Sequence, residues 1–99
     1  MPLKTFQQTA PQVGKKNYID NSAVIIGDVS LGDDVSVWPM SVIRGDVAAI
    51  TIGDKTNVQD GAVLHVSHAG DYSPEASPLT IGKSVTIGHR AVVHACTVG

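Results

Sequence analysis

The segment LGDDVSVWPMSVIRGD, residues 31–46, places aliphatic side chains at Leu31, Val37 and Ile43, six positions apart. The same spacing continues in both directions along the chain. Twelve aliphatic residues follow it in four groups of three: Val13, Ile19, Ile25; Leu31, Val37, Ile43; Ile52, Val58, Leu64; Ile81, Ile87, Val93. A six-residue period matches neither a helix face nor a simple strand. It predicts an all-β solenoid of short parallel strands separated by tight turns.

The six-residue period is interrupted twice, after Ile43 and after Leu64, and both residues end a group of three. Glycine follows the first member of every group despite these interruptions, at Gly14, Gly32, Gly53 and Gly82. Three hexads therefore form one triangular coil, with insertions at a single corner. We expect about four coils over residues 13–98 and a corner loop over residues 67–79, which is rich in turn-forming residues.

The fifth position of each hexad often holds a small or β-branched residue and is also predicted to point inward. These residues are Ala23, Val29, Val35, Ser41, Val47, Thr56, Ala62, Val85, Ala91 and Thr97. In a solenoid each coil is stabilised by the coils above and below it. Stacking is therefore the expected source of stability in a single domain of 99 residues.

The two ends of the sequence lack the regular pattern. Residues 1–12 show no clear period and are interpreted as an extended lead-in without chemistry. Val98 and Gly99 repeat the aliphatic-glycine pair that opens each coil. We therefore expect a truncated version of a longer solenoid, whose open end offers unpaired strand edges for self-association.

Composition excludes several classes of protein. Seven Lys and Arg against nine Asp and Glu leave no basic stripe for nucleic acid. The start of the chain has no apolar run of signal-peptide or membrane-spanning length. Cys96 is the single cysteine and cannot form an internal disulfide, so a reducing cytoplasm is the expected compartment.

His65 and His94 follow the third members of their groups, Leu64 and Val93, and are predicted to stack. Adjacent parallel strands lie about 4.8 Å apart, so two imidazoles at equal register can converge on one metal ion. His89 lies two positions after the second member, Ile87, and so belongs to the neighbouring face. It is predicted to reach the metal from another subunit of a homotrimer.

Three neutral imidazoles with one open position form the ligand set of a catalytic zinc. The alternative is that these histidines are simply solvated, as surface histidines usually are. The stacked pair and a third histidine at a trimer-compatible position favour metal. His68 begins the corner loop and is interpreted as a surface residue rather than a ligand.

Polar residues occupy the same two columns. Arg44 precedes His65 by one coil, and Asp46 lies near it on the third face. Gln59 and Asp60 follow Val58, and Asp60 has the register of His89. Arg44 of one subunit is predicted to pair with Asp60 of the next, because a planar guanidinium suits a carboxylate.

Three segments carry a resemblance to a known family: IRGD at 43–46, NVQDGAVLH at 57–65 and IGHRAVVHAC at 87–96. They closely resemble the γ-class carbonic anhydrase-like family of hexapeptide-repeat proteins. The resemblance implies a left-handed parallel β-helix, usually followed by a C-terminal helix, in a homotrimer. It also implies reversible hydration of carbon dioxide by a metal-bound hydroxide, with Zn²⁺, Fe²⁺ or Co²⁺ as the metal.

The family's functional residues match individual positions of this sequence. The resemblance implies that His65, His89 and His94 are metal ligands and that Gln59 holds the metal-bound water or hydroxide. Arg44 and Asp60 resemble the family's inter-subunit ion pair, with Asp46 in the same network.

Two departures from the family pattern predict a weak or inactive enzyme in this short form. The family's acidic proton-transfer positions hold Val47 and His68 here. The later coils, with a further active-site asparagine, and the terminal helix are absent from this sequence. The alternatives are a non-catalytic trimeric binding or assembly module, similar to relatives named for siderophore binding, and a hexapeptide-repeat acyltransferase. The latter uses a histidine base in a cleft between subunits.

Overall fold

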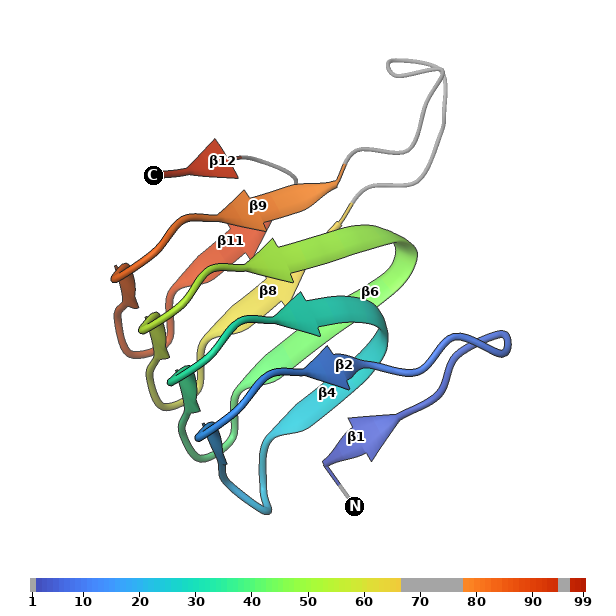
Figure 1. Ribbon diagram of the computed structural model, residues 1–99, viewed down its shortest axis with the longest axis horizontal. Helices are drawn as coiled ribbons and strands as arrows, with labels where there is room; N and C mark the ends of the chain where they lie inside the picture. The colour runs from blue at the N-terminus through green and yellow to red at the C-terminus, as the bar shows by residue number, and fades with distance from the viewer. Residues whose placement is uncertain (1, 67–77, 95–96) are drawn as a thin grey trace.

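The computed structural model describes residues 2–66, 78–94 and 97–99, apart from the side chains of Val47 and Thr97 (Figure 1). Most of the predicted corner loop, with His68, and also Cys96 lie outside the described residues. The described residues form β-strands and turns, and none of them forms a helix long and apolar enough to cross a membrane. The strands are β1 (Leu3–Lys4), β2 (Gln12–Val13), β3 (Tyr18–Ile19), β4 (Val24–Leu31), β5 (Ser36–Val37), β6 (Val42–Ile52), β7 (Asn57–Val58), β8 (Val63–His65), β9 (Leu79–Ile81), β10 (Thr86–Ile87), β11 (Val92–His94) and β12 (Thr97–Val98).

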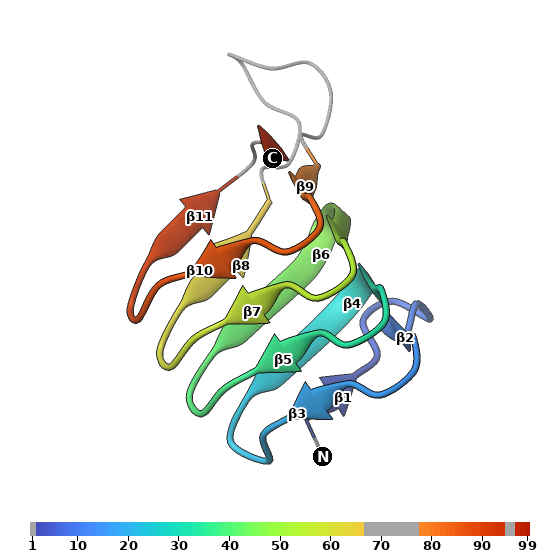
Figure 2. The ribbon, with the colours of Figure 1, turned by 60° about the vertical axis from the view of Figure 1, so that its left-hand side comes forward.

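All twelve strands pair in parallel, and they build the three faces of a triangular coil (Figures 1 and 2). The first face holds β2, β9, β12 and the second halves of β4 and β6. The second face holds β3, β5, β7 and β10. The third face holds β1, β8, β11 and the first halves of β4 and β6. The predicted all-β parallel solenoid is thus confirmed.

The core is made of the residues that carry the six-residue period. Nine of the twelve are buried: Ile25, Leu31, Val37, Ile43, Ile52, Val58, Leu64, Ile81 and Ile87. Ile19 and Val93 are half-buried and Val13 is exposed, because they belong to the end coils and lack a covering neighbour. Burial of each aliphatic side chain stabilises the fold by about 1.5–3 kcal/mol.

Two buried polar residues occupy fifth positions and bond to the next coil. Ser41 Oγ donates to the carbonyl of Gln59 at 2.8 Å, and Thr56 Oγ1 donates to the carbonyl of Gly82 at 2.7 Å. These bonds offset the cost of burying a hydroxyl. The assignment of Val47 to an inward fifth position is wrong in register, because Val29 aligns with Ile50. The extra residues between Ile43 and Ile52 shift Val47 into the corner.

The glycine after each first-face strand allows close stacking at the corner between the first and second faces. A Cβ at Gly53 would lie 2.7 Å from the carbonyl carbon of Gly82, and one at Gly32 would lie 2.9 Å from the amide nitrogen of Asp54. Both distances are too short for a side chain. The glycines therefore keep successive coils in register across the insertions.

The corner between the third and first faces carries the insertions, as predicted. Residues 2–12 add a further one. β1 pairs with β4, which aligns Leu3 with Ile25, and Val13 aligns with Leu31. Between them, Phe6 and Thr9 form an antiparallel bridge around Gln7 and Gln8, whose φ angles are 48° and 69°. The segment interpreted as an extended lead-in thus supplies an additional strand to the third face and a tight turn.

Candidate metal centre

Arg44, His65 and His94 form the predicted column on the outside of the third face. Strand pairing aligns Arg44 of β6 with His65 of β8, and His65 with His94 of β11. The two imidazole rings have centroids 5.4 Å apart and planes inclined by 34°. The six-residue period therefore predicted the histidine stack correctly.

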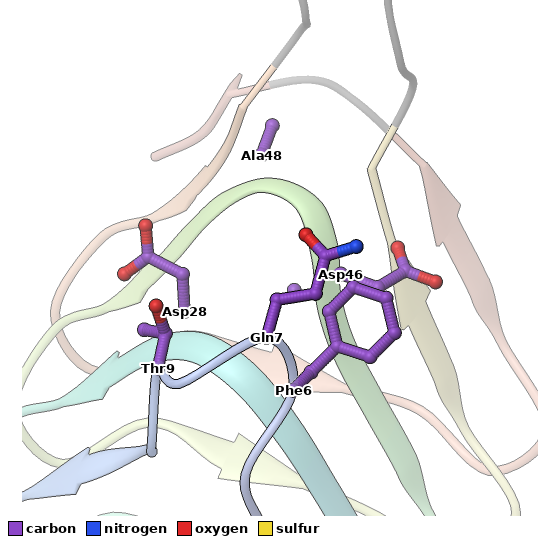
Figure 3. Close-up of a pocket in the computed structure, with 7 residues that line it drawn as sticks. Phe6, Gln7, Thr9, Asp28, Asp46 and Ala48 are labelled. Carbon is purple, nitrogen blue, oxygen red and sulfur yellow. The ribbon is translucent and has the colours of Figure 1, made fainter.

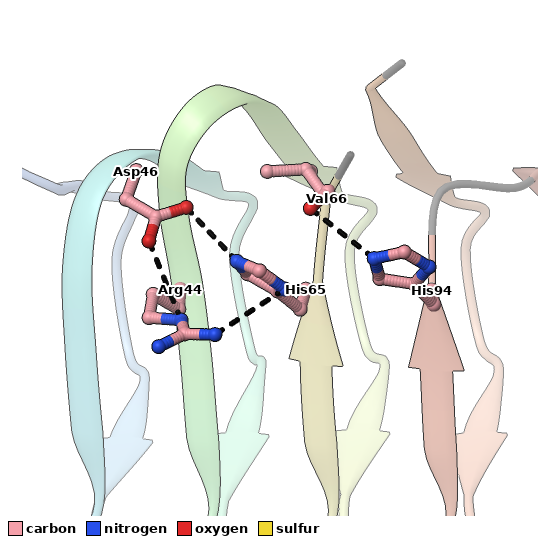
Figure 4. Close-up of polar contacts among 5 residues, drawn as sticks. All are labelled: Arg44, Asp46, His65, Val66 and His94. Carbon is pink, nitrogen blue, oxygen red and sulfur yellow. Dashed lines mark hydrogen bonds and ion pairs between the residues drawn. The ribbon is translucent and has the colours of Figure 1, made fainter. Parts of the chain in front are cut away.

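Both ring nitrogens of His65 have partners within the chain (Figure 4). Nε2 lies 2.9 Å from Asp46 Oδ1, and Nδ1 lies 3.3 Å from Arg44 Nη2. A carboxylate accepts and a guanidinium donates, so a neutral imidazole with its proton on Nε2 satisfies both contacts. Arg44 Nε also lies 3.4 Å from Asp46 Oδ2. The three side chains form one connected polar cluster.

Asp46 is held in its ionised form by this cluster. Partial burial favours the neutral acid, but the hydrogen bond from His65, the electrostatic attraction of its N–H and the positive charge of Arg44 outweigh it, and the pKa of Asp46 is lowered. The predicted membership of Asp46 in the polar network of the third face is therefore consistent with its contacts.

Asp46 also lines a pocket at the corner between the third and first faces (Figure 3). The cavity of about 220 Å³ is open to solvent and is lined by Phe6, Gln7, Thr9, Asp28, Gly45, Asp46 and Ala48. The N-terminal turn at Phe6 to Thr9 thus lies close to the acidic member of the His65 cluster. This proximity does not follow from the six-residue period.

His94 has a different partner from His65. Its Nε2 donates to the carbonyl of Val66 at 3.2 Å, at the end of β8 (Figure 4). Nothing in the residue pattern indicates this bond, because a backbone acceptor is available at every residue. It orients the imidazole of His94 over the neighbouring strand.

His89 lies on the corner between the second and third faces, after β10. Its Nδ1 is 3.7 Å from Asp60 Oδ1, and the amide of Arg90 donates to the carbonyl of Asp60, which places the two turns one above the other. The side chains of His89 and Asp60 are 68% and 55% exposed. Gln59 is half-buried in the same turn as Asp60. The predicted shared register of Asp60 and His89 is thus observed.

One chain brings two of the three predicted ligands together. His89, on the adjacent corner, does not join His65 and His94, and no group of three His, Cys, Asp or Glu that could hold a metal ion is found within residues 2–66, 78–94 and 97–99. Paired imidazoles on neighbouring strands fit zinc, iron(II) or cobalt(II), which all accept imidazole ligands. Among the described residues, one chain thus offers two neighbouring imidazoles to a metal ion.

Comparisons with known proteins agree with this geometry. The family described as "Bacterial transferase hexapeptide (six repeats)" matches residues 10–45. The crystal structure of a hexapeptide transferase family protein from Anaplasma phagocytophilum superimposes with a TM-score of 0.82 at 41% identity, covering 96% of this chain and 51% of that one. The chain thus has the left-handed parallel β-helix of the hexapeptide-repeat proteins.

Relatives with curated names narrow the family. "Protein YrdA" of Escherichia coli (strain K12) is 52% identical over 97 residues, which are 98% of this chain and 53% of that protein. "Gamma carbonic anhydrase 1, mitochondrial" of Arabidopsis thaliana is 45% identical over 89 residues, which are 90% of this chain and 32% of that protein. The chain is a γ-carbonic anhydrase-like hexapeptide-repeat protein.

A third relative is also named as a carbonic anhydrase. "Carbonic anhydrase" of Geobacillus kaustophilus (strain HTA426) is 38% identical over 93 residues, covering 94% of this chain and 47% of that protein. The chain spans about half the length of this relative and of the Escherichia coli protein.

Proposed function

We propose that this protein binds a metal ion, Zn²⁺ first and Fe²⁺ or Co²⁺ as alternatives, between the subunits of a homotrimer and hydrates carbon dioxide reversibly to bicarbonate. The observation that carries the proposal is the stack of His65 and His94, with His89 on the adjoining corner. The carbonic anhydrase names of several relatives support the reaction.

The proposed ligands are His65 and His94 of one subunit and His89 of the next. When bound, the metal lowers the pKa of a water molecule to about 7 and so supplies a hydroxide nucleophile. Gln59 shares the corner of His89, so its amide would come from the same neighbouring subunit and position that water. Neutral imidazoles leave the site its full positive charge, which favours ionised water.

Metal binding through Nε2 of His65 requires a change in the observed cluster. Nε2 must lose its proton and its bond to Asp46, and the proton of the neutral ring then sits on Nδ1, which faces Arg44. Two donors cannot bond to each other, so Arg44 must turn away. Asp60 of the neighbouring subunit is the proposed new partner of Arg44. Metal binding and assembly are therefore coupled.

Catalytic turnover is expected to be weak. The family positions for acidic proton-transfer groups hold Val47 and His68. An aliphatic side chain carries no exchangeable proton, and His68 puts an imidazole where the family has an acid. We therefore expect the protein to bind the metal ion but to hydrate carbon dioxide slowly.

Metal analysis and a carbon dioxide hydration assay test the two parts of the proposal separately. We expect close to one metal ion per chain in protein purified without added metal, and its loss in the His94→Ala variant. Anaerobic and aerobic preparations distinguish iron(II) from zinc. Trace metal that His65→Ala and His94→Ala leave unchanged would contradict the metal site. Metal without hydration activity would contradict the enzyme.

Two other functions are alternatives to this proposal. The names of the matching family and of the Anaplasma structure refer to transferases, which favours an acyltransferase; tight binding of acetyl-CoA by calorimetry would support that assignment. The second alternative is a non-catalytic binding or assembly module. Stoichiometric metal with neither activity nor acetyl-CoA binding would favour the module.

The proposed compartment is the cytoplasm, on the composition of the sequence alone. The Arabidopsis relatives carry mitochondrial names, which apply to those proteins. Fractionation of cells that express the protein tests the compartment.

A further inference from the structure

The pocket at the corner between the third and first faces combines acidic, aromatic and neutral polar side chains (Figure 3). Asp28 and Thr9 lie on one side of it, Phe6 and Asp46 lie on the other, and Gln7 lies between them. The cavity of about 220 Å³ is open to solvent, so a small molecule can enter it. Among the described residues that line it, none is a proposed metal ligand.

The N-terminal turn that closes one side of the pocket is fixed by the fold. The amide of Phe6 donates to the carbonyl of Thr9 at 2.9 Å, and the amide of Thr9 donates to the carbonyl of Phe6 at 3.0 Å. Phe6 also packs close to β4, since a Cβ added at Gly27 would lie 3.4 Å from Phe6 Cβ. The pocket is therefore formed without a ligand, and a ligand would have to order little of the chain.

Two carboxylates give the pocket a negative charge. Asp46 is paired with Arg44 and His65, but each carboxylate oxygen can accept more than one hydrogen bond. Among the described residues, no ion pair neutralises Asp28 on the opposite side. The pocket thus offers one uncompensated negative charge, with the side-chain oxygens of Gln7 and Thr9 as further acceptors.

This lining favours an organic cation over a metal ion. A hard metal ion needs several oxygen ligands that converge on one point. Asp28 and Asp46 instead lie on opposite sides of the cavity, and within residues 2–66, 78–94 and 97–99 no group of three His, Cys, Asp or Glu could hold a metal ion. A guanidinium is planar, donates in several directions and stacks on aromatic rings such as that of Phe6.

We propose that this pocket binds the guanidinium group of a small molecule between Asp28 and Asp46, with the ring of Phe6 against its planar face. The two carboxylates accept charge-assisted hydrogen bonds from its N–H groups. The oxygens of Gln7 and Thr9 accept the remaining ones. The site requires neither a metal ion nor a second subunit, so its test is independent of the proposed function.

A nuclear magnetic resonance titration of the isotope-labelled, metal-free protein with methylguanidinium, at constant ionic strength, tests the site. We expect saturable shifts of the amide signals of the pocket residues. Asp28→Asn is expected to raise the dissociation constant at least about tenfold, because the uncompensated charge is lost. Asp28 is exposed, so the variant is expected to fold, which its amide spectrum checks.

Asp34→Asn is the matched control. It removes the same charge from an exposed position on the corner between the first and second faces, and asparagine tolerates the φ of 58° at this residue. The control is expected to bind methylguanidinium like the wild type. Phe6→Leu is expected to raise the dissociation constant about threefold, because the aromatic face is lost.

Three further probes define the class of ligand. Methylurea has a similar planar shape without the charge and is expected not to bind, and methylammonium is expected to bind more weakly because it cannot stack. A capped arginine tripeptide is expected to bind no more tightly than methylguanidinium; much tighter binding would assign the site to a protein ligand and contradict the proposal. Shifts that do not saturate, equal affinity in Asp28→Asn, or equal binding of methylurea or methylammonium would overturn it.

Discussion

The third face and the corner beside it both carry histidines, but their surroundings differ. On the third face, the side chains of His65 and Asp46 are 24% and 19% exposed, and they are bonded to each other. On the corner, the side chains of His89 and Asp60 are 68% and 55% exposed and 3.7 Å apart. The third face therefore satisfies its polar groups within the chain. The corner presents the side chains of His89 and Asp60 outward.

This difference separates the two roles in the proposed site. Strand register holds His65 and His94 in place, because each lies directly beyond a residue of the core column. Backbone hydrogen bonds from Arg90 to Asp60 and from Ala91 to Gly88 hold the turn that carries His89. In the proposed shared site, the third face would contribute two imidazoles placed by strand register, and the corner would contribute one imidazole on an exposed turn.

The largest expected effect is a loss of folding stability when a core residue beneath the third face is shortened. Leu64 is fully buried beneath the column of histidines, and Leu64→Ala is expected to lower the free energy of unfolding by about 2–5 kcal/mol. Asp60→Ala, on the exposed corner, is expected to change it by less than about 0.5 kcal/mol. Urea denaturation of the metal-free protein measures both. Equal losses in the two variants would contradict the contrast between the regions.

A smaller effect is expected from the polar cluster. Asp46→Ala removes the acceptor of His65 Nε2 and should lower the stability of the metal-free protein by about 1 kcal/mol at neutral pH. The folded-state pKa of Asp46 is lowered below its ordinary 3.8, so its stabilisation is present above that value and is lost as the pH falls through the folded-state pKa. The variant and the wild type should therefore converge in acid. A difference that persists or grows in acid would contradict the cluster.

The smallest effect is expected at Tyr18 and Asp20, where the first coil reaches the corner between the second and third faces. The Tyr18 hydroxyl donates to Asp20 at 2.8 Å, and this bond, with minor help from burial and the nearby charge, raises the pKa of Tyr18 above 10.0. Asp20→Ala should lower the pKa of Tyr18 towards its ordinary value. Ultraviolet titration in a Tyr72→Phe background reads Tyr18 alone. An unchanged titration would show that the hydrogen bond is not formed in solution.

The fold and the histidine stack could be predicted from the sequence because both follow from the six-residue period. The period states which residues share a column, and strand pairing then brings His65 and His94 together. It does not state what long side chains do within a column. The pairing of Arg44 with Asp46 in its own chain was therefore missed, as was the bond from His94 to the carbonyl of Val66.

Two further features of the structure could not be predicted from the sequence, for other reasons. Leu3 lies ten positions before Val13, so the strand at Leu3–Lys4 does not follow the period, and only tertiary pairing reveals it. Outward-facing valines on the third face alternate with inward aliphatic residues, as in Val42 beside Ile43. A simple count of hydrophobic residues cannot separate the two sides of such a strand.

Co-expression of two defective variants tests the shared site most directly. His65→Ala and His89→Ala should each purify without metal, because each removes one ligand from every site. In mixed trimers, a third face from the His89→Ala chain meets a corner from the His65→Ala chain, and random assembly restores about a quarter of the sites. Co-expression of His65→Ala with His94→Ala, both changed on the same face, should restore none. Recovery of about a quarter of the wild-type metal in the first pair alone is the predicted result. Full metal in His89→Ala by itself, or no recovery in the first pair, would contradict a site shared between subunits.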